Sequence, residues 1–180
     1  MITIKDSVHD HIEVGDLGAA LLDTPPVQRL RRVSQLGTAS FVYPSANHSR
    51  FEHSLGVYSL ANRALDRLEL RGEDKRTVRA AALLHDVGHL PYSHTVEGLL
   101  ENYTGRYHDD VAHVLEAGDV ARVLAENDVD PHRVADLIAG KERLGQLIAG
   151  ELDVDRMDYL VRDAHHTGVP YGFIDVERLL

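Results

Sequence analysis

The sequence predicts an all-α protein, a compact helical bundle with at most a short β-hairpin at its N-terminus. Two observations lead to this fold class. Apolar residues recur at helical spacing through most of the chain, and prolines and glycines separate the runs. Strands do not alternate with helices, as a parallel sheet would require. The 180 residues fit one domain, residues 1–180, because single cores commonly hold about 100–200 residues.

The elements follow from these patterns in chain order. Residues 2–14 alternate loosely between apolar and polar side chains, which indicates a hairpin or an extended arm. The first helix is expected to begin at Thr24, whose hydroxyl can cap it before two prolines, and to end at Gly37. Residues 42–49 are typical of a loop. Further helices are predicted over residues 51–70, 73–85, 93–103 (or 94–103), 108–117, 120–126, 131–139, 144–148 and 154–166, and Asp175 is expected to cap a last short segment.

Composition excludes several classes of protein. Without cysteine there is no disulfide framework, thiolate zinc site or cysteine nucleophile. The net charge of −10 argues against general nucleic-acid binding, which needs a basic face. No apolar run reaches the roughly 20 residues of a membrane helix, and the N-terminus lacks the pattern of a signal peptide. We therefore expect a cytoplasmic protein, without a membrane partner, that can form a homo-oligomer.

Residue types that can ligate a metal ion, histidine together with aspartate and glutamate, are concentrated at four places, residues 50–54, 85–94, 108–110 and 153–159, which hold five of the 12 histidines. His85 and Asp86 follow an apolar run, and two ionisable groups at the end of a buried helix are costly unless paired or bound to metal. Neighbours on a helix point about 100° apart and can hold one ion from two sides. Imidazole and carboxylate suit Fe, Mn, Ni, Zn or Mg. The alternative is that His85 and Asp86 pair with each other or cap the helix.

Three longer segments carry a resemblance. Residues 44–57, 84–94 and 153–163 resemble the motifs of the HD-domain metal-dependent phosphohydrolase superfamily, in its deoxynucleoside triphosphate triphosphohydrolase branch. The resemblance extends from about Ile4 to the end of the chain. It implies that the metal ligands are His53, His85, Asp86 and Asp155, and we expect one divalent ion. Such an ion polarises a phosphoryl oxygen and lowers the pKa of bound water.

The resemblance also implies catalytic roles for His89, His94 and His108. Gly88 and Pro91 interrupt the helix here, so the segment can turn its imidazoles into a cleft. The leaving group of a phosphate ester needs a proton, and histidine titrates near neutral pH. His94 is the predicted general acid and His108 its partner. The alternative for His108 is a surface residue that begins a helix.

Five further residues are candidates for binding the substrate: Arg50, Arg156, Tyr159, Asp163 and Gln35. Arginine forks bind phosphate oxygens, whereas the alternative for both arginines is a salt bridge to an acid such as Glu52 or Asp158. Tyr159 and Asp163 lie on the same helix face as Asp155, and in relatives these positions contact the sugar or order the site. Gln35 is expected at the sugar or, alternatively, at the surface.

The remaining histidines and a basic run receive ordinary interpretations. His9, His11 and His48 are expected in loops or at the surface, and His113 and His132 on helices. The pair at residues 165–166 is expected near the cleft or, alternatively, away from it. The arginines at positions 29, 31 and 32 form either a solvated helix face or a contact with a nucleotide or a neighbouring subunit.

Three functions stay open. The first is a metal-dependent phosphohydrolase that converts a deoxynucleoside triphosphate into deoxynucleoside and triphosphate. The second is a phosphomonoesterase or phosphodiesterase acting on a nucleoside phosphate, and the third is a non-catalytic scaffold that binds a nucleotide. The chain ends 25 residues after Asp155, whereas the larger triphosphohydrolases continue for hundreds of residues. A natural end and a truncated chain are both compatible with the sequence.

Overall fold

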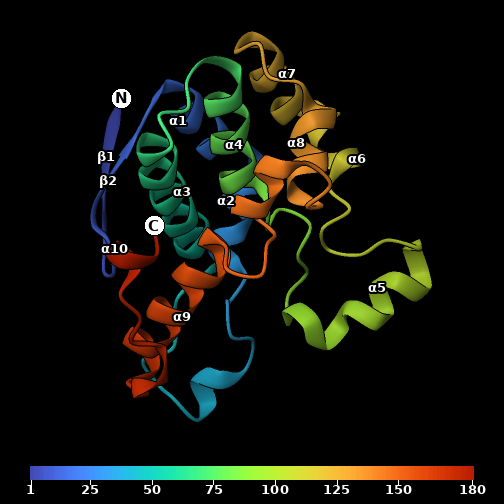
Figure 1. Cartoon of the computed structure of the whole chain (residues 1–180). Coiled ribbons are helices and arrows are strands. Elements are labelled where there is room, and N and C mark those ends of the chain that lie inside the picture. The colour runs from blue at the N-terminus through green and yellow to red at the C-terminus, as the bar shows by residue number, and fades with distance from the viewer.

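The computed structural model describes the backbone of residues 1–180 and the side chains of residues 1–92 and 95–180. It is all-α with a two-stranded hairpin at the N-terminus, which confirms the predicted fold class (Figure 1). The strands are β1 (Ile2–Asp6) and β2 (Asp10–Val14). The helices are α1 (Asp16–Leu22), α2 (Pro25–Arg29), α3 (Arg50–Arg67), α4 (Gly72–Leu84), α5 (Glu97–Thr104), α6 (Ala112–Leu115), α7 (Gly118–Glu126), α8 (Pro131–Ile138), α9 (Val154–Thr167) and α10 (Val176–Leu179).

The hairpin pairs β1 and β2 in antiparallel register, from Ile2 opposite Val14 to Asp6 opposite Asp10. Ile12 and Val14 are buried in the core, whereas His11 and Glu13, which alternate with them, are exposed. This alternation is the two-residue period of a strand with one covered face. Figure 1 shows the hairpin alongside α3, so the N-terminus of the chain lies against the helix that carries His53.

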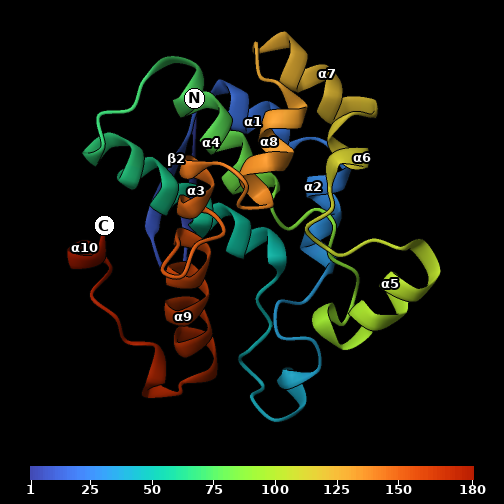
Figure 2. The same cartoon turned by 45° about the vertical axis from the view of Figure 1, so that its right-hand side comes forward.

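The core is centred on α3 and α4, which pack against each other, with α9 on α3 and with α1 and α8 on α4 (Figure 2). The start of α3 is fixed by a capping box, in which Ser49 and Glu52 satisfy each other's backbone N–H groups. Asp153 caps α9 by accepting a hydrogen bond from the Arg156 backbone N–H at 2.7 Å. These caps set the first turns of two helices that contribute to the site.

A glycine allows α9 to approach α3 closely. A Cβ atom added at Gly56 would lie 1.8 Å from an Asp158 carboxylate oxygen and 2.5 Å from an Arg162 guanidinium nitrogen. No real Cβ occupies such a position, so this stretch of α3 must present bare backbone to α9. The small residue therefore lets a buried carboxylate and its arginine reach the α3 surface.

Several predicted elements differ from the structure. Helix α1 was not predicted. The cap at Asp175 is as expected, because its side chain accepts a hydrogen bond from the Arg178 backbone N–H at the start of α10. The helix predicted from Thr24 to Gly37 ends early, because Ser34 pairs with Ser49 and Val33 accepts a hydrogen bond from the Arg50 backbone N–H. Residues 108–117 form only the short helix α6, and residues 143–147 form a 3-10 turn. In these places the apolar spacing alone predicted a longer helix, whereas in the structure tertiary contacts or short loops end the helix earlier.

The segment around α5 stands away from the body of the molecule in both views (Figures 1 and 2). None of the described residues of α5 is buried, and the side chains of Leu99 and Tyr103 are exposed. Across the part of the chain with described residues, no helix combines the length and apolar composition needed to cross a membrane.

Candidate metal centre and phosphate site

The four predicted metal ligands come together from α3, the end of α4 and α9. The Nε2 atoms of His53 and His85 lie 3.2 Å apart, and Asp155 Oδ1 is 2.8 Å from the former and 3.8 Å from the latter. Asp86 Oδ1 is 3.4 Å from His85 Nε2. One ligand atom each from His53, His85 and Asp86 fits within 4.8 Å, which is a group that could hold a metal ion.

The orientation of both imidazoles fits a metal ion. His53 Nδ1 donates to Asp158 Oδ2 at 2.8 Å, and His85 Nδ1 donates to the Ala82 carbonyl at 2.9 Å. Both acceptors require the proton on Nδ1, so each neutral ring turns the lone pair of its Nε2 toward the centre. Carboxylates and carbonyls behind histidine ligands commonly fix the ring in this way. Two imidazole nitrogens and two carboxylates facing one another need a shared cation or proton.

The charges around His53 also indicate that this site needs a shared cation or proton. Burial opposes its charged form, but hydrogen bonds with Asp155 and Asp158 and the charge of Asp86 outweigh burial and raise the pKa of His53 to about 10. Burial likewise opposes ionisation of Asp86, yet the neighbouring His85 and Arg50 hold its pKa well below the usual range. The imidazole and carboxylate groups of the cluster thus stabilise each other's charged forms, and a divalent cation can replace the imidazole proton among the carboxylates around His53.

Arg50 is buried and donates from its NH1 nitrogen to Asp86 Oδ2 at 2.7 Å. The alternative partner Glu52 accepts instead from the backbone N–H and hydroxyl of Ser49. Arg50 therefore orients a predicted metal ligand and places its positive charge beside the cluster.

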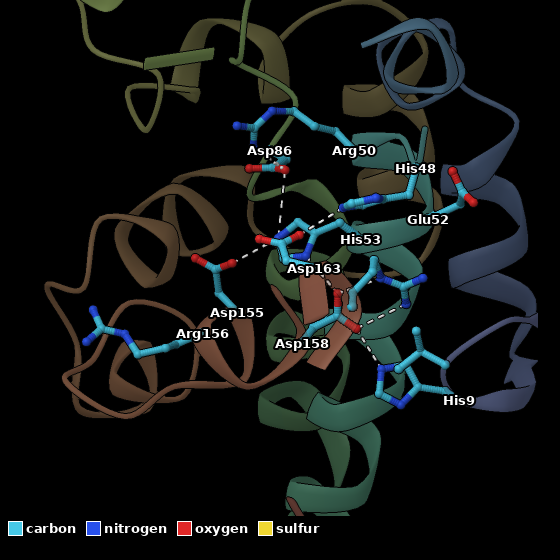
Figure 3. Close-up of polar contacts among 12 residues, drawn as sticks. His9, His48, Arg50, Glu52, His53, Asp86, Asp155, Arg156, Asp158 and Asp163 are labelled. Atoms are coloured by element: carbon cyan, nitrogen blue, oxygen red, sulfur yellow. Dashed lines mark hydrogen bonds and ion pairs between the residues drawn. The ribbon is translucent and has the colours of Figure 1, made fainter. Parts of the chain in front are cut away.

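Behind His53 lies a buried network that the sequence analysis did not single out. Asp158, which is fully buried, accepts from Arg162 Nε at 2.9 Å and contacts His9 Nε2 at 2.6 Å (Figure 3). Arg162 donates in turn to Asp6 at 2.8 Å and 3.1 Å. The spacing of four residues between Asp158 and Arg162 on α9 could have indicated that these two side chains pair. No local pattern indicates the contribution of the hairpin.

His89 and His108 lie together beside the cluster. Their rings stack with centroids 4.1 Å apart, and His89 Nε2 is 3.4 Å from Asp86 Oδ1. His108 pairs with Glu97 through Nδ1. His108 occupies a turn rather than beginning a helix, and a Cβ at Gly88 would lie 2.1 Å from its carbonyl oxygen, so Gly88 permits this approach. His94 lies outside the described side chains.

These groups surround one cavity of about 230 Å³. Its described lining includes every predicted metal ligand together with five predicted catalytic or substrate-binding residues: Gln35, Arg50, His89, His108 and Tyr159. The Oε1 atom of Gln35 is buried there without a hydrogen-bond partner in the structure. An acceptor left in that state is costly, so Gln35 offers a site for a donor such as a substrate hydroxyl.

Two predicted substrate-binding residues lie outside the described lining of this cavity. The side chain of Arg156 is exposed and points away from the cluster in Figure 3, because it occupies the first turn of α9 on the face opposite the core. Asp163 accepts from His48 Nε2 at 2.8 Å, and with Tyr159 it borders a neighbouring cavity of about 280 Å³. The structure therefore does not bring Arg156 and Asp163 to the metal cluster.

Three residues expected in loops, at the surface or on a solvated face make contacts that bury them wholly or in part, although His9 lies in a turn and His48 in a loop. His48 is buried, pairs with Asp163 and stacks on His166 with ring centroids 4.5 Å apart. The imidazole of His9 is 8% exposed, because the hairpin turn folds onto α9. Arg29 is not on a solvated face, since it donates to the carbonyls of Val87 and His89 at 2.8 Å and 2.7 Å and fixes the segment after α4.

Comparison with known proteins assigns the family. Residues 50–163 match the model of the HD domain. The chain is 42% identical to uncharacterized protein YwfO of Bacillus subtilis over 98% of its length, and 38% identical to a deoxynucleoside triphosphate triphosphohydrolase SAMHD1 homolog of Dictyostelium discoideum over 92%. A crystal structure of a hypothetical protein from Aquifex aeolicus superimposes on 99% of the chain with a TM-score of 0.88 and 39% identity.

The chain belongs to the HD domain family. This membership and the similarity to a named triphosphohydrolase support a hydrolase. The chain spans 42% and 36% of the lengths of the two curated relatives and 50% of the Aquifex chain. Membership of the family therefore does not by itself assign to this chain the activity of a full-length relative.

Proposed function

We propose that this protein is a metal-dependent phosphohydrolase that cleaves deoxynucleoside triphosphates into deoxynucleoside and triphosphate. One observation carries the proposal: the ligand cluster of two histidines and two aspartates shares a single cavity with Arg50, His89 and His108. This is a metal-ligand set, an anion-binding group and proton donors within one space. The similarity to the Dictyostelium triphosphohydrolase supports the choice of substrate.

The metal ion would be held by His53, His85, Asp86 and Asp155, and when bound it supplies a Lewis acid for a phosphoryl oxygen. Hydrolysis breaks the bond between the α-phosphorus and the 5′ oxygen, and water supplies the new oxygen to phosphorus and a proton to the sugar. We assign proton transfer to the leaving oxygen to His94, with His89 and His108 as partners. Histidine suits this role because its pKa lies near neutrality.

Arg50 is assigned to the phosphate oxygens, since its guanidinium can present two parallel N–H groups to them. Tyr159 and Gln35 are assigned to the sugar, together with Asp163 across the shared wall of the neighbouring cavity.

The volume of the cavity favours a second candidate function. About 230 Å³ lies below the roughly 300–1,000 Å³ that usually holds a ligand of drug size. Such a space matches the phosphate-bearing end of a substrate more closely than a whole nucleoside triphosphate. A phosphomonoesterase or phosphodiesterase with the same metal ligands is therefore the alternative.

Product analysis separates these activities. The purified protein is loaded separately with Mn²⁺, Fe²⁺, Ni²⁺, Zn²⁺ or Mg²⁺ and incubated with the four deoxynucleoside triphosphates and the matching monophosphates. Inorganic triphosphate with free deoxynucleoside is the expected product. Orthophosphate released from the monophosphates would replace the proposal by the second candidate, and tight nucleotide binding without turnover at any metal would identify a scaffold.

A further inference from the structure

The turn of the N-terminal hairpin, residues 6–9, is held in one conformation by the carboxylate of Asp6. Asp6 Oδ1 accepts hydrogen bonds from the backbone N–H groups of Val8 and His9 at 3.0 Å and 2.8 Å. The same carboxylate accepts two bonds from Arg162 on α9. One side chain therefore shapes the turn and attaches it to α9.

This attachment places His9 against Asp158. His9 Nε2 lies 2.6 Å from Asp158 Oδ1, while Asp158 Oδ2 accepts from His53 Nδ1 at 2.8 Å. Figure 3 shows Asp158 with His53 on one side and His9 on the other. The two side chains of the outer contact are 8% and 0% exposed, so water does not compete for it.

The two other donors to Asp158 come from α9 and α3. Arg162 lies four residues further along the helix of Asp158 and bonds both carboxylate oxygens, so it moves with that helix. His9 comes from a different element, 149 residues away. It therefore fixes the carboxylate relative to the rest of the molecule, and with it the ring of His53.

We infer that the hairpin turn is part of the metal centre, in which His9 and Asp6 are positioning residues that hold Asp158 and thereby aim His53 Nε2 at the ion. The inference rests on the proposed role of His53 as a ligand. The role differs from packing, because the buried apolar residues of the hairpin, Ile12 and Val14, lie on β2 away from the turn. A further polar contact joins the turn to α9, where Ser7 Oγ is 3.2 Å from His166 Nε2.

Metal affinity tests the inference without using activity. Co²⁺ is titrated into metal-free protein and followed by its visible absorption, which reports the coordination of the ion, and thermal melting of the metal-free protein is measured in parallel. The variants are His9→Leu, which keeps bulk but loses the donor, and His9→Gln, whose amide can reach the position of Nε2. His11→Leu is the matched control, because His11 lies on the same hairpin with its side chain 51% exposed.

We expect His9→Leu to weaken Co²⁺ binding by about tenfold or more, as changes behind histidine ligands commonly do, and to alter the absorption spectrum. His9→Gln should restore the wild-type affinity to within about threefold, since it restores the hydrogen bond, and His11→Leu should bind as the wild type does. If His9→Leu does not fold, His9→Asn takes its place, because its amide is too short to reach Asp158.

Wild-type affinity and spectrum in His9→Leu, with or without a lower melting temperature, would overturn the inference and leave His9 a structural residue. Equal losses in His9→Leu and His9→Gln would also overturn it, because the donor would then not be what matters. Failure of the wild-type protein to bind Co²⁺ would instead contradict the proposed function, so the two failures are distinguishable.

Discussion

Two parts of the site are built in different ways. The metal cluster stands on α3, α4 and α9, in the packed centre of the protein, where His53 is 1% and His85 is 8% exposed. The histidines assigned to proton transfer belong to the segment from His89 to His108. His89 is buried beside Asp86, and the chain after it leaves the body of the molecule through α5 before it reaches His108. His108 keeps a side chain that is 30% exposed.

This difference corresponds to two requirements of the proposed site, namely fixed positions for the metal ligands and a way in for the substrate. Helix packing and buried hydrogen bonds hold the ligands, so a ligand cannot move without disturbing the core. His108 depends on the close approach of a loop at Gly88 and on its pair with Glu97. A loop over a rigid scaffold is a common arrangement where a substrate must enter and leave. Changes in the packed part should therefore abolish metal binding, whereas changes in the segment beyond His89 should alter turnover alone.

Asp86→Asn is expected to have the largest effect, reducing metal content and hydrolysis to background. The neutral amide is a much weaker ligand for a divalent cation, while it still accepts a hydrogen bond from Arg50 and so preserves the buried pair. Elemental analysis and product formation measure the two effects. Asp110→Asn, an exposed acid, is the control. Retention of bound metal by Asp86→Asn would contradict the ligand assignment.

His108→Gln comes next, with a fall of up to about 10²–10⁴-fold in kcat and no loss of bound metal, because the partner of the proposed general acid His94 is removed while the cluster stays intact. Steady-state kinetics and metal analysis on the same sample test this. His113→Gln, at an exposed position nearby, should match the wild type. Loss of metal in His108→Gln would remove the distinction between the two parts of the site.

Substitution of glycine by alanine should have unequal effects in the two parts. Gly56→Ala forces a methyl group into the Asp158 carboxylate and should lower the free energy of unfolding by about 1–3 kcal/mol and weaken metal binding. Gly98→Ala on α5 meets nothing within 4 Å and should not lower it, because alanine favours helix. Urea unfolding measures both variants. Equal destabilisation would show that α5 is as constrained as the core.

Asp6→Asn should have the smallest effect, a loss of about 1 kcal/mol at pH 7, with a defined pH dependence. Burial raises the pKa of Asp6, but hydrogen bonds and charge from Arg162 outweigh burial and lower it below its ordinary value of 3.8. The ionised carboxylate therefore stabilises the fold above about pH 4 and loses this effect as the pH falls through its lowered pKa.

The difference in unfolding free energy between wild type and Asp6→Asn should consequently stay constant from about pH 5 to 8, at the roughly 1 kcal/mol of one hydrogen bond. It should shrink below about pH 4. Urea unfolding across this range measures it. Asp10→Asn, exposed at the other end of the turn, provides the control. A difference that grows in acid would have the wrong sign for a carboxylate with a lowered pKa.

Much of the fold could be predicted because its signals are local. The apolar spacing of α3, α4 and α9 and the alternation of β2 lie within a few turns of chain, and the motifs around His53, His85 and Asp155 are contiguous. Helix ends were less predictable. The extension of the second helix to Gly37 failed because Ser34 pairs with Ser49, a contact that apolar spacing does not encode.

The sequence by itself determined the helical class and the three helical segments that carry the ligand set, and it left the N-terminal segment as either a hairpin or an extended arm. Only the tertiary structure decided that His9 and His48 are buried, that Arg156 faces away from the cluster, and that Asp158 holds His53. The physical reason is that spacing specifies which face of a helix is apolar. Which polar groups meet depends on how closely two helices approach, and here that approach depends on the missing side chain of Gly56.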